Sequence, residues 1–465
     1  MAGNSMTRRD FLKGAARSTE TVAKTAKERP KMTMRRDAHG DEISLLGYGM
    51  MRLPTVDGKH ANGWASGASS AKIDQELVNR QIDYAIEHGV NYFDTSPAYC
   101  RGESETVTGT ALSRHPRSSY KIATKLSNFA PQFWPLEKSK QMFENSLKAL
   151  RTEYIDYYLL HSIGNGDKTL GNDGFKTFLA RFVENGAVDW LAEERSAGRI
   201  RNLGFSYHGD RRAFEWCMDH HGKYKWDFCQ IQMNYVDWRH AKAVNSRNLD
   251  GEYLYGELEK RNIPVVVMEP LLGGRLARFD KTLASFLKPL DPDATLAEWS
   301  FRFCGHFPRV LTCLSGMTEM QFLEENCRTF SPIKPLSAEE LATLEKAAAA
   351  YVGGSNIPCT DCKYCMPCPY GLDIPGIFSV WNDAASQGRL PFAGTPGFEE
   401  SRTRFLREYN ERIPPLRQCD RCVTCGLCAS HCPQSINIPD EMVRIDAFIE
   451  NLKRSIRDPG AAGRS

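Results

Sequence analysis

Eight short β-rich runs that alternate with longer amphipathic stretches predict an α/β protein whose main domain is a (β/α)8 barrel. The runs fall within about 290 residues, which is the usual size of one such barrel. After them, a cysteine-rich stretch predicts a second domain that is small and mainly α-helical. The length of 465 residues, with 41% hydrophobic and 25% charged residues, suits one large globular domain with additions.

The predicted barrel occupies residues 38–335. Its eight strands are Ile43–Gly49, Val90–Asp94, Tyr120–Lys125, Ile155–His161, Ile200–Phe205, Phe228–Ile231, Ile263–Met268 and Val310–Leu314. A doubly wound sheet is the alternative, but it would place a GxGxxG motif after an early strand, and here Gly49 is followed by Met50 and Met51.

A basic tail, residues 1–37, precedes the barrel. Residues 1–36 hold ten basic and three acidic residues, so the rest of this +3 chain carries a charge of about −4 and does not suit nucleic-acid binding. Thr7–Lys13 resembles a twin-arginine export signal, but charged residues interrupt the segment after it. We therefore expect a cytoplasmic protein, with export in the folded state as the alternative. The sequence has no run of eighteen apolar residues, so we expect no membrane span.

Four titratable side chains fall at or just after three successive strand ends. Asp94 ends the second strand, Tyr99 follows it, Lys125 ends the third strand, and His161 ends the fourth. In a barrel these ends meet at one mouth. A lysine beside a tyrosine lowers the pKa of the phenol, and a histidine can hydrogen-bond a carbonyl oxygen. The four side chains therefore predict reduction of a carbonyl group, with Tyr99 as the acid and Asp94 orienting Lys125.

With these four residues, the domain resembles the aldo-keto reductase family over roughly residues 40–330. The resemblance implies a TIM barrel that binds NADP(H) or NAD(H) and acts on a small carbonyl or alcohol substrate. It places the cofactor contacts at Met50, Ser206, Gln230, Pro270, Leu271, Gly316, Glu325 and Asn326. Many members use a lysine and an arginine to bind the 2′-phosphate of NADP, but this chain has Gly316 and Phe322 there. NADP is therefore only modestly favoured over NAD.

A linker helix, residues 336–354, connects the barrel to the cysteine domain, residues 355–455. Ser337 and Glu340 form a capping box at its start, and Gly353 marks its end. In the cysteine domain, Val443, Ile445, Phe448, Ile449, Leu452 and Ile456 make an apolar helical face near the C-terminus. We expect this face to dock onto the barrel.

The cysteines are clustered: nine of the fifteen lie between Cys359 and Cys432. One run is Cys359, Cys362, Cys365 and Cys368, and the other is Cys422, Cys425, Cys428 and Cys432, the last followed by proline. The second run has the spacing of bacterial ferredoxins, which predicts two 4Fe-4S clusters. Zinc is the weaker alternative, because it needs two cysteine pairs separated by a longer loop.

Ferredoxin spacing assigns Cys432 to the first run's cluster and Cys368 to the second, because the fourth cysteine of each run ligates the other cluster. About fifty residues separate the runs, far more than in a small ferredoxin, so the pairing could differ. We expect Cys419 to be a spare thiol. The chain is thus predicted to be an oxidoreductase with attached clusters that serve a redox partner protein. The alternative is an iron-sulfur electron-transfer protein whose barrel is a docking scaffold.

Overall fold

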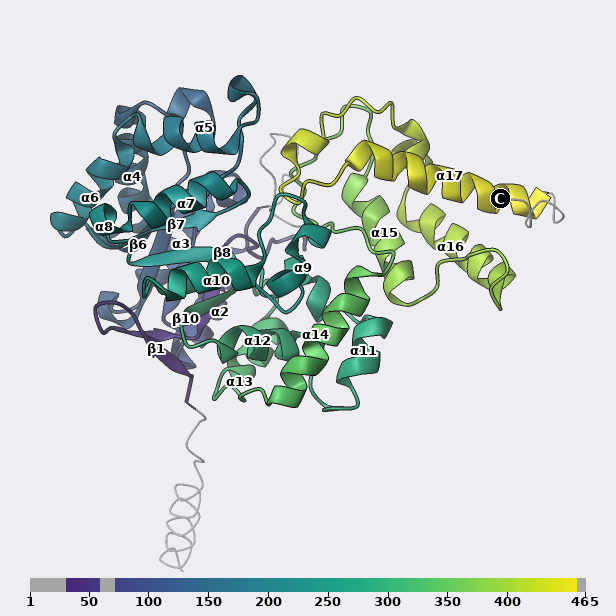
Figure 1. Cartoon of the computed structure of the whole chain (residues 1–465), viewed down its shortest axis with the longest axis horizontal. Coiled ribbons are helices and arrows are strands. Elements are labelled where there is room, and N and C mark those ends of the chain that lie inside the picture. The colour runs from purple at the N-terminus through teal and green to yellow at the C-terminus, as the bar shows by residue number, and fades with distance from the viewer. Residues whose placement is uncertain (1–30, 59–71, 458–465) are drawn as a thin grey trace, which may run out of the picture. The chain divides into compact units, whose positions relative to one another are not determined.

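The computed structural model describes residues 31–58 and 72–457 (Figure 1). Eight parallel strands form a closed barrel in the order β10, β3, β4, β5, β6, β7, β8 and β9. They are β3 (Leu46–Gly49), β4 (Tyr92–Asp94), β5 (Lys121–Leu126), β6 (Ile155–Ile163), β7 (Ile200–Tyr207), β8 (Phe228–Gln232), β9 (Val265–Met268) and β10 (Val310–Ser315). The predicted barrel is confirmed, and the twin-arginine-like segment lies outside the described residues.

The first predicted strand, Ile43–Gly49, forms two strands rather than one. Its first residues belong to β2 (Glu42–Ser44), which pairs antiparallel with β1 (Met34–Arg36) in a separate two-stranded sheet. The Ser44 hydroxyl donates a hydrogen bond to the carbonyl of Leu46, 2.7 Å away, across the bend between the two strands. Apolar runs do not reveal such a bend, because both strands are buried.

Helices surround the barrel strands and continue into the C-terminal lobe (Figure 1). Helix α4 shows why they form, since it buries Phe143, Leu147 and Leu150 on one face at helical spacing. The helices that follow barrel strands or their loops are α2 (Gln75–Glu87), α3 (Ser104–Leu112), α4 (Leu136–Leu150), α5 (Gly174–Phe178), α6 (Ala187–Ser196), α7 (Arg211–Asp219), α8 (His221–Tyr224), α9 (Asp237–Val244), α10 (Gly251–Glu259), α11 (Lys281–Leu287), α12 (Leu296–His306) and α13 (Met320–Thr329).

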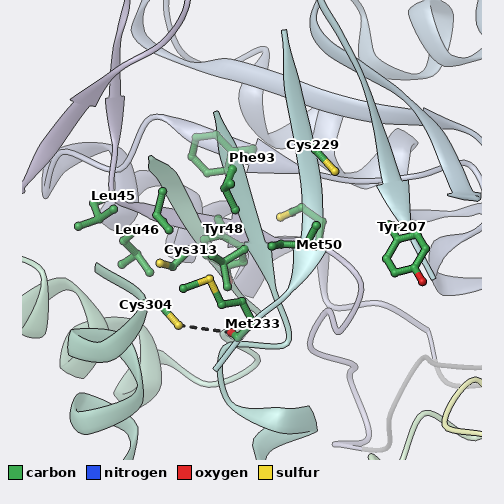
Figure 2. Packing of buried hydrophobic residues seen from close by; sticks show 14 of the residues in the cluster. Leu45, Leu46, Tyr48, Met50, Phe93, Tyr207, Cys229, Met233, Cys304 and Cys313 are labelled. Atoms are coloured by element: carbon green, nitrogen blue, oxygen red, sulfur yellow. Dashed lines mark hydrogen bonds between the residues drawn. The ribbon is translucent and has the colours of Figure 1, made fainter. Parts of the chain in front are cut away.

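Two apolar layers hold the barrel together. One layer includes Tyr92, Tyr157 and Phe228, whose aromatic rings pack against one another. The second, larger layer packs the strands against the helices, and Figure 2 shows part of it. In this layer the Cys304 thiol donates a hydrogen bond to the carbonyl of Met233, 3.4 Å away. Cysteines in the barrel thus serve as small core residues.

The C-terminal lobe has an apolar core of its own. It follows α14 (Ala338–Val352), whose predicted capping box is present, and contains α15 (Ile374–Ser386), α16 (Phe398–Arg412) and α17 (Ile438–Arg457). No helix in the described ranges is long and apolar enough to cross a bilayer. Barrel and lobe belong to one compact unit that begins at Met32.

The prediction that the last helix docks onto the barrel is wrong. Ile445, Ile449 and Leu452 of α17 are buried in the core of the lobe. Val443 and Ile456, from the same predicted face, are each more than half exposed. An amphipathic pattern shows that a helix has an apolar face but does not identify the element that covers it.

Candidate active site and cysteine centres

The four predicted catalytic side chains come together at the carboxyl ends of β4, β5 and β6. Asp94 is the last residue of β4, Lys125 lies near the end of β5, and His161 lies near the end of β6. Tyr99 begins a short 3-10 turn after β4. Parallel pairing of these strands carries all four side chains to one rim.

A buried ion pair lies at the base of this site. Lys125 Nζ is 2.6 Å from Asp94 Oδ1 and 2.7 Å from the carbonyl oxygen of Thr95. Burial raises the pKa of Asp94 and lowers the pKa of Lys125, while the attraction between the two charges opposes both shifts. The contact fixes the ammonium of Lys125, since two of its three donors have acceptors.

The Tyr99 phenol lies beside the other three side chains. Lys125 Nζ is 4.8 Å from the centroid of the Tyr99 ring, and the His161 ring meets that ring edge-on at 5.8 Å between centroids. The prediction that Lys125 lowers the pKa of Tyr99 is wrong: burial raises this pKa well above its ordinary value, and the charge of Asp94 raises it further. Lys125 already pairs with Asp94, so its charge is largely offset. Tyr99 is therefore a protonated donor at neutral pH.

The His161 ring is held by two serines. Its Nδ1 lies 2.6 Å from the Ser127 hydroxyl and 3.4 Å from the Ser96 hydroxyl. Burial lowers the pKa of His161 well below its ordinary value, and the nearby charge of Lys125 lowers it further. We assign the neutral tautomer in which Nδ1 accepts from Ser127, which leaves Nε2–H as the free donor.

Arg181 was not predicted as a site residue, yet it supports the backbone at His161. It lies in a π-helical turn, Leu179–Val183, and is almost fully buried. Its guanidinium donates to the carbonyl oxygen of His161 at 2.8 Å and to that of Ser162 at 3.2 Å. Single π-helical turns are frequent at functional sites, but the sequence pattern does not announce them.

A cavity of about 850 Å³ is lined by three of the four side chains, all but the buried Lys125, and we call it the mouth cavity. Asp94, Tyr99 and His161 line it from the barrel, and Cys362 and Cys365 line it from the lobe. The cavity therefore joins the predicted catalytic residues to the cysteine-rich loops.

Half of the predicted cofactor contacts line the mouth cavity. These residues are Gln230, Pro270, Leu271 and Gly316. Gln230 Oε1 is buried and has no hydrogen-bond partner in the described part of the chain, so it can accept a bond from a ligand. In the loop after β9, Gly273 and Gly274 adopt φ angles of 67° and 91°, which expose backbone to the cavity. An amide acceptor and a glycine loop on one wall fit a nicotinamide dinucleotide.

The other four predicted contacts do not line the cavity. The prediction for Met50 is wrong, because its side chain is fully buried in the barrel core (Figure 2). Its neighbours Met51 and Arg52 line the cavity wall instead. Ser206 is also fully buried, and its hydroxyl accepts a hydrogen bond from the backbone N–H of Ser162 at 2.7 Å. Ser162 takes the place at the cavity wall.

Glu325 and Asn326 lie on α13, next to the cavity rather than on its wall. Glu325 accepts a hydrogen bond from the Thr295 hydroxyl at 2.7 Å, and the Asn326 amide donates to the Ser315 hydroxyl at 3.1 Å. Both side chains therefore have partners within the protein. The distance of Glu325 and Asn326 along the sequence from the last predicted strand does not reveal that Thr295 and Ser315 are their partners.

The eight predicted ligand cysteines form two groups of four. In the first group, burial raises the pKa of Cys359 to about 12 and of Cys362 to about 11, and the nearby Cys432 raises both. Cys365 is close enough to these three for each to raise its pKa, and Cys428 of the second run raises it as well. The closeness of Cys432 to the first run supports the pairing that ferredoxin spacing predicts.

The second group is assembled in the same way. Burial raises the pKa of Cys428 to about 11, and nearby Cys368, Cys422 and Cys425 raise it further. Within the described ranges, no three histidine, cysteine or acidic side chains converge on a single ion-sized site. Four thiols in each group match the number of cysteine ligands that a 4Fe-4S cluster takes.

Cys419 stands apart from both groups. It is buried, and its Sγ lies 3.0 Å from the Tyr409 hydroxyl and 3.6 Å from the Asp446 carboxylate. These partners belong to α16 and α17. Its place in the lobe core supports the prediction of a spare thiol.

The lobe meets the barrel through short polar contacts. Arg52 donates to the carbonyl oxygen of Thr360 at 2.8 Å, and the Asn245 amide donates to that of Pro433 at 2.8 Å. Arg247 donates to the carbonyl oxygen of Cys432 at 3.3 Å. The acceptors of these hydrogen bonds are Cys432 of the first group and two residues next to cysteines of that group, Thr360 and Pro433.

Residues 358–436 match the 4Fe-4S dicluster domain. A probable aldo-keto reductase from Glycine max is 30% identical over 172 residues, which cover 35% of this chain and 44% of that protein. Less than half of that relative's length is therefore spanned.

Two solved structures share the fold. The holo form of an aldo-keto reductase from Bacillus halodurans has a TM-score of 0.53 and 23% identity, covering 69% of this chain and 97% of its own. An aldo/keto reductase from Klebsiella pneumoniae, in complex with NADP and acetate, has a TM-score of 0.50 and 21% identity, covering 68% and 95%. The aldo/keto reductase family model matches residues 46–349, more than half of the residues. By this match and by its barrel, the chain belongs to the aldo/keto reductase family.

Proposed function

We propose that this protein is an NAD(P)(H)-dependent oxidoreductase that reduces an aldehyde, ketone or sugar carbonyl, or catalyses the reverse reaction. The observation that carries this proposal is the meeting of Asp94, Tyr99 and His161 at the mouth cavity, with Lys125 buried against Asp94 and Tyr99. A protonated phenol, a neutral imidazole and a fixed ammonium suit a developing alkoxide better than any hydrolytic reaction.

Each residue has a distinct task in this proposal. Tyr99 gives its phenolic proton to the carbonyl oxygen, and His161 Nε2–H donates a hydrogen bond to the same oxygen. Lys125 holds the Tyr99 ring in place by a cation–π contact, because its ammonium lies 4.8 Å from the ring centroid. Asp94 keeps Lys125 charged and oriented. In the reverse direction, the Tyr99 phenolate takes a proton from the alcohol.

The cofactor would lie along the wall formed by Gln230, Pro270, Leu271 and Gly316. Nicotinamide, when bound, supplies the hydride for reduction or accepts it in oxidation. The unpaired Oε1 of Gln230 suits the carboxamide nitrogen, and the loop at Gly273 suits the pyrophosphate. We propose NADP(H) ahead of NAD(H), in keeping with the relative from Klebsiella pneumoniae that was crystallised with NADP.

The decisive variant is Tyr99→Phe in the full-length, cluster-loaded protein. We expect carbonyl reduction to fall by roughly 10²–10⁴-fold, the usual contribution of a positioned acid, because phenylalanine has no proton to give. Binding of NADPH, followed by nicotinamide fluorescence, should stay within about twofold because the hydroxyl is not an assigned cofactor contact. Tyr370→Phe is the matched control, since Tyr370 is half exposed in the lobe.

Equal turnover by wild type and Tyr99→Phe, tested on aldehydes, ketones and aldoses, would refute the catalytic assignment. A comparable loss in Tyr370→Phe would show that the assay reports stability instead of proton transfer. Thermal melts of both variants separate these two readings.

We propose further that the two cysteine groups hold 4Fe-4S clusters that exchange single electrons with a partner protein. Cys425 of the second group is exposed, which supports access for such a partner. Purified protein should then contain about eight iron atoms per chain. The alternative, a cluster protein with a scaffold barrel, gains no support from the site, because a scaffold needs no buried Asp94–Lys125 pair.

A further inference from the structure

Arg52 occupies a central position on the wall of the mouth cavity. It follows β3 directly, is half-buried, and lines the cavity. Its own carbonyl oxygen accepts a hydrogen bond from the Thr318 hydroxyl at 2.8 Å, which ties the loop after β3 to the loop after β10. The backbone at Arg52 is therefore fixed against the segment expected to bind the adenosine end of the cofactor.

The side chain of Arg52 crosses Gly316. A Cβ built on Gly316 would lie 3.6 Å from Arg52 Cβ and 3.8 Å from Arg52 Cδ, which is ordinary contact. Gly316 is one of the two positions at which the family resemblance predicts a basic residue for phosphate binding. Phe322, at the other position, is 46% exposed and uncharged. The aliphatic part of the Arg52 side chain thus occupies the space beside Gly316.

The guanidinium of Arg52 continues from Gly316 towards the loop after β9. Its Nη2 donates to the carbonyl oxygen of Thr360 at 2.8 Å. Thr360 in turn packs against Gly273, where an added Cβ would lie only 2.3 Å from Thr360 Cβ. The guanidinium therefore lies between the two segments that face the phosphates of the cofactor.

In the described part of the chain no carboxylate neutralises the charge of Arg52, and this charge lies close enough to Cys362 to lower the pKa of that thiol against the rise that burial causes. Within residues 31–58 and 72–457, no carboxylate lies at ion-pair distance from the guanidinium of Arg52, and its hydrogen bond to Thr360 uses one of five N–H donors. Phosphate prefers planar guanidinium groups, which can donate two parallel hydrogen bonds. A half-buried guanidinium on a cavity wall, with no carboxylate partner among the described residues, is suited to bind such an anion.

We propose that Arg52 binds a phosphate group of the nicotinamide dinucleotide, replacing the charge that Gly316 and Phe322 do not supply. This inference rests on the proposed function. It also gives the lobe a part in cofactor binding, because Thr360 lies between Cys359 and Cys362 and orients the guanidinium. Arg52 would be a specificity-determining residue contributed by the loop after the first barrel strand.

The test is the affinity of the full-length, cluster-loaded protein for NADPH and for NADH, measured by nicotinamide fluorescence. We expect Arg52→Gln to weaken NADPH binding by roughly 10–100-fold, the usual worth of hydrogen bonds to a charged group. Arg52→Lys keeps the charge but loses the paired donors, so its loss should be smaller. The matched control is Arg80→Gln, because Arg80 is exposed on α2 and lies off the cavity wall.

Comparison of the two dinucleotides identifies the phosphate. Loss of affinity for NADPH alone supports contact with the 2′-phosphate, and equal loss for both supports contact with the pyrophosphate. Unchanged affinity for both, in an Arg52→Gln protein with wild-type iron content and melting temperature, would overturn the inference alone. Failure of the wild-type protein to bind either dinucleotide would overturn the proposed function as well.

Discussion

The barrel mouth and the cysteine lobe hold their functional groups in different ways. In the barrel, strand pairing and a buried ion pair fix Asp94 and Lys125 at 2.6 Å. In the lobe, the eight thiols lie in loops, and most of them are only half-buried around a much smaller apolar core. The catalytic geometry therefore follows from the fold, whereas the lobe depends on its clusters to fix the loops.

The two regions are nevertheless joined at one wall. Thr360, in the loop between two cysteines of the first group, contacts both Arg52 and Gly273 of the barrel. A change in that loop therefore reaches the predicted cofactor site directly. Experiments that damage one region alone can show how far the other depends on it.

The largest effect should follow from breaking the buried ion pair. Lys125→Met leaves Asp94 buried without a partner, so we expect a loss of about 3–5 kcal/mol in unfolding free energy, together with nearly all activity. Denaturant titration and turnover assays measure the two losses. Lys121→Met is the matched control on the same strand, because Lys121 pairs with the half-exposed Asp41 at the other end. That variant should lose about 0–1 kcal/mol.

The next largest effect should be confined to the lobe. Cys362→Ala should remove one cluster and so roughly half of the iron, while Cys419→Ala should leave the iron content unchanged. Iron analysis of anaerobically purified protein measures both. An unchanged iron content in Cys362→Ala would contradict the ligand set, and iron loss in Cys419→Ala would make that thiol a ligand.

A smaller effect should appear as pH falls. Folding lowers the pKa of His161. Below about pH 6.5 this side chain is therefore protonated in the unfolded chain but still neutral in the native protein. Stability is therefore lost as pH falls, by about 1.4 kcal/mol per pH unit from this residue. Denaturant titrations of wild type and His161→Gln should show a shallower slope in the variant. Parallel slopes would mean that His161 titrates normally in the folded protein.

Much of the fold and catalytic site could be predicted from the sequence, because strand ends in a barrel meet at one mouth. That rule and the positions of three apolar runs were enough to identify Asp94, Lys125 and His161. The cysteine pairing likewise comes from spacing alone, and it stays a prediction. Both predictions use information that lies within short segments of the chain.

The remaining features depend on contacts between distant segments. Nothing near Arg52 in the sequence indicates that its side chain packs against Gly316. Likewise, nothing near Arg181 indicates that its guanidinium binds the carbonyl oxygen of His161. The raised pKa of Tyr99 also escaped prediction, because the pattern shows that Lys125 is near but not that Asp94 already pairs with it. Periodicity gives the apolar face of α17 but not the core that it joins.

The central claim is that the barrel transfers hydride to a carbonyl without passing electrons to the clusters. It is tested most directly by the visible spectrum of the anaerobic, cluster-loaded protein, recorded with NADPH before and after a carbonyl substrate is added. A hydride carries its two electrons together, whereas each cluster accepts one electron at a time. This conversion normally needs a flavin, so NADPH alone should leave the cluster absorbance unchanged. The nicotinamide band should then decay only when the carbonyl is present. Bleaching of the clusters by NADPH alone would contradict the account.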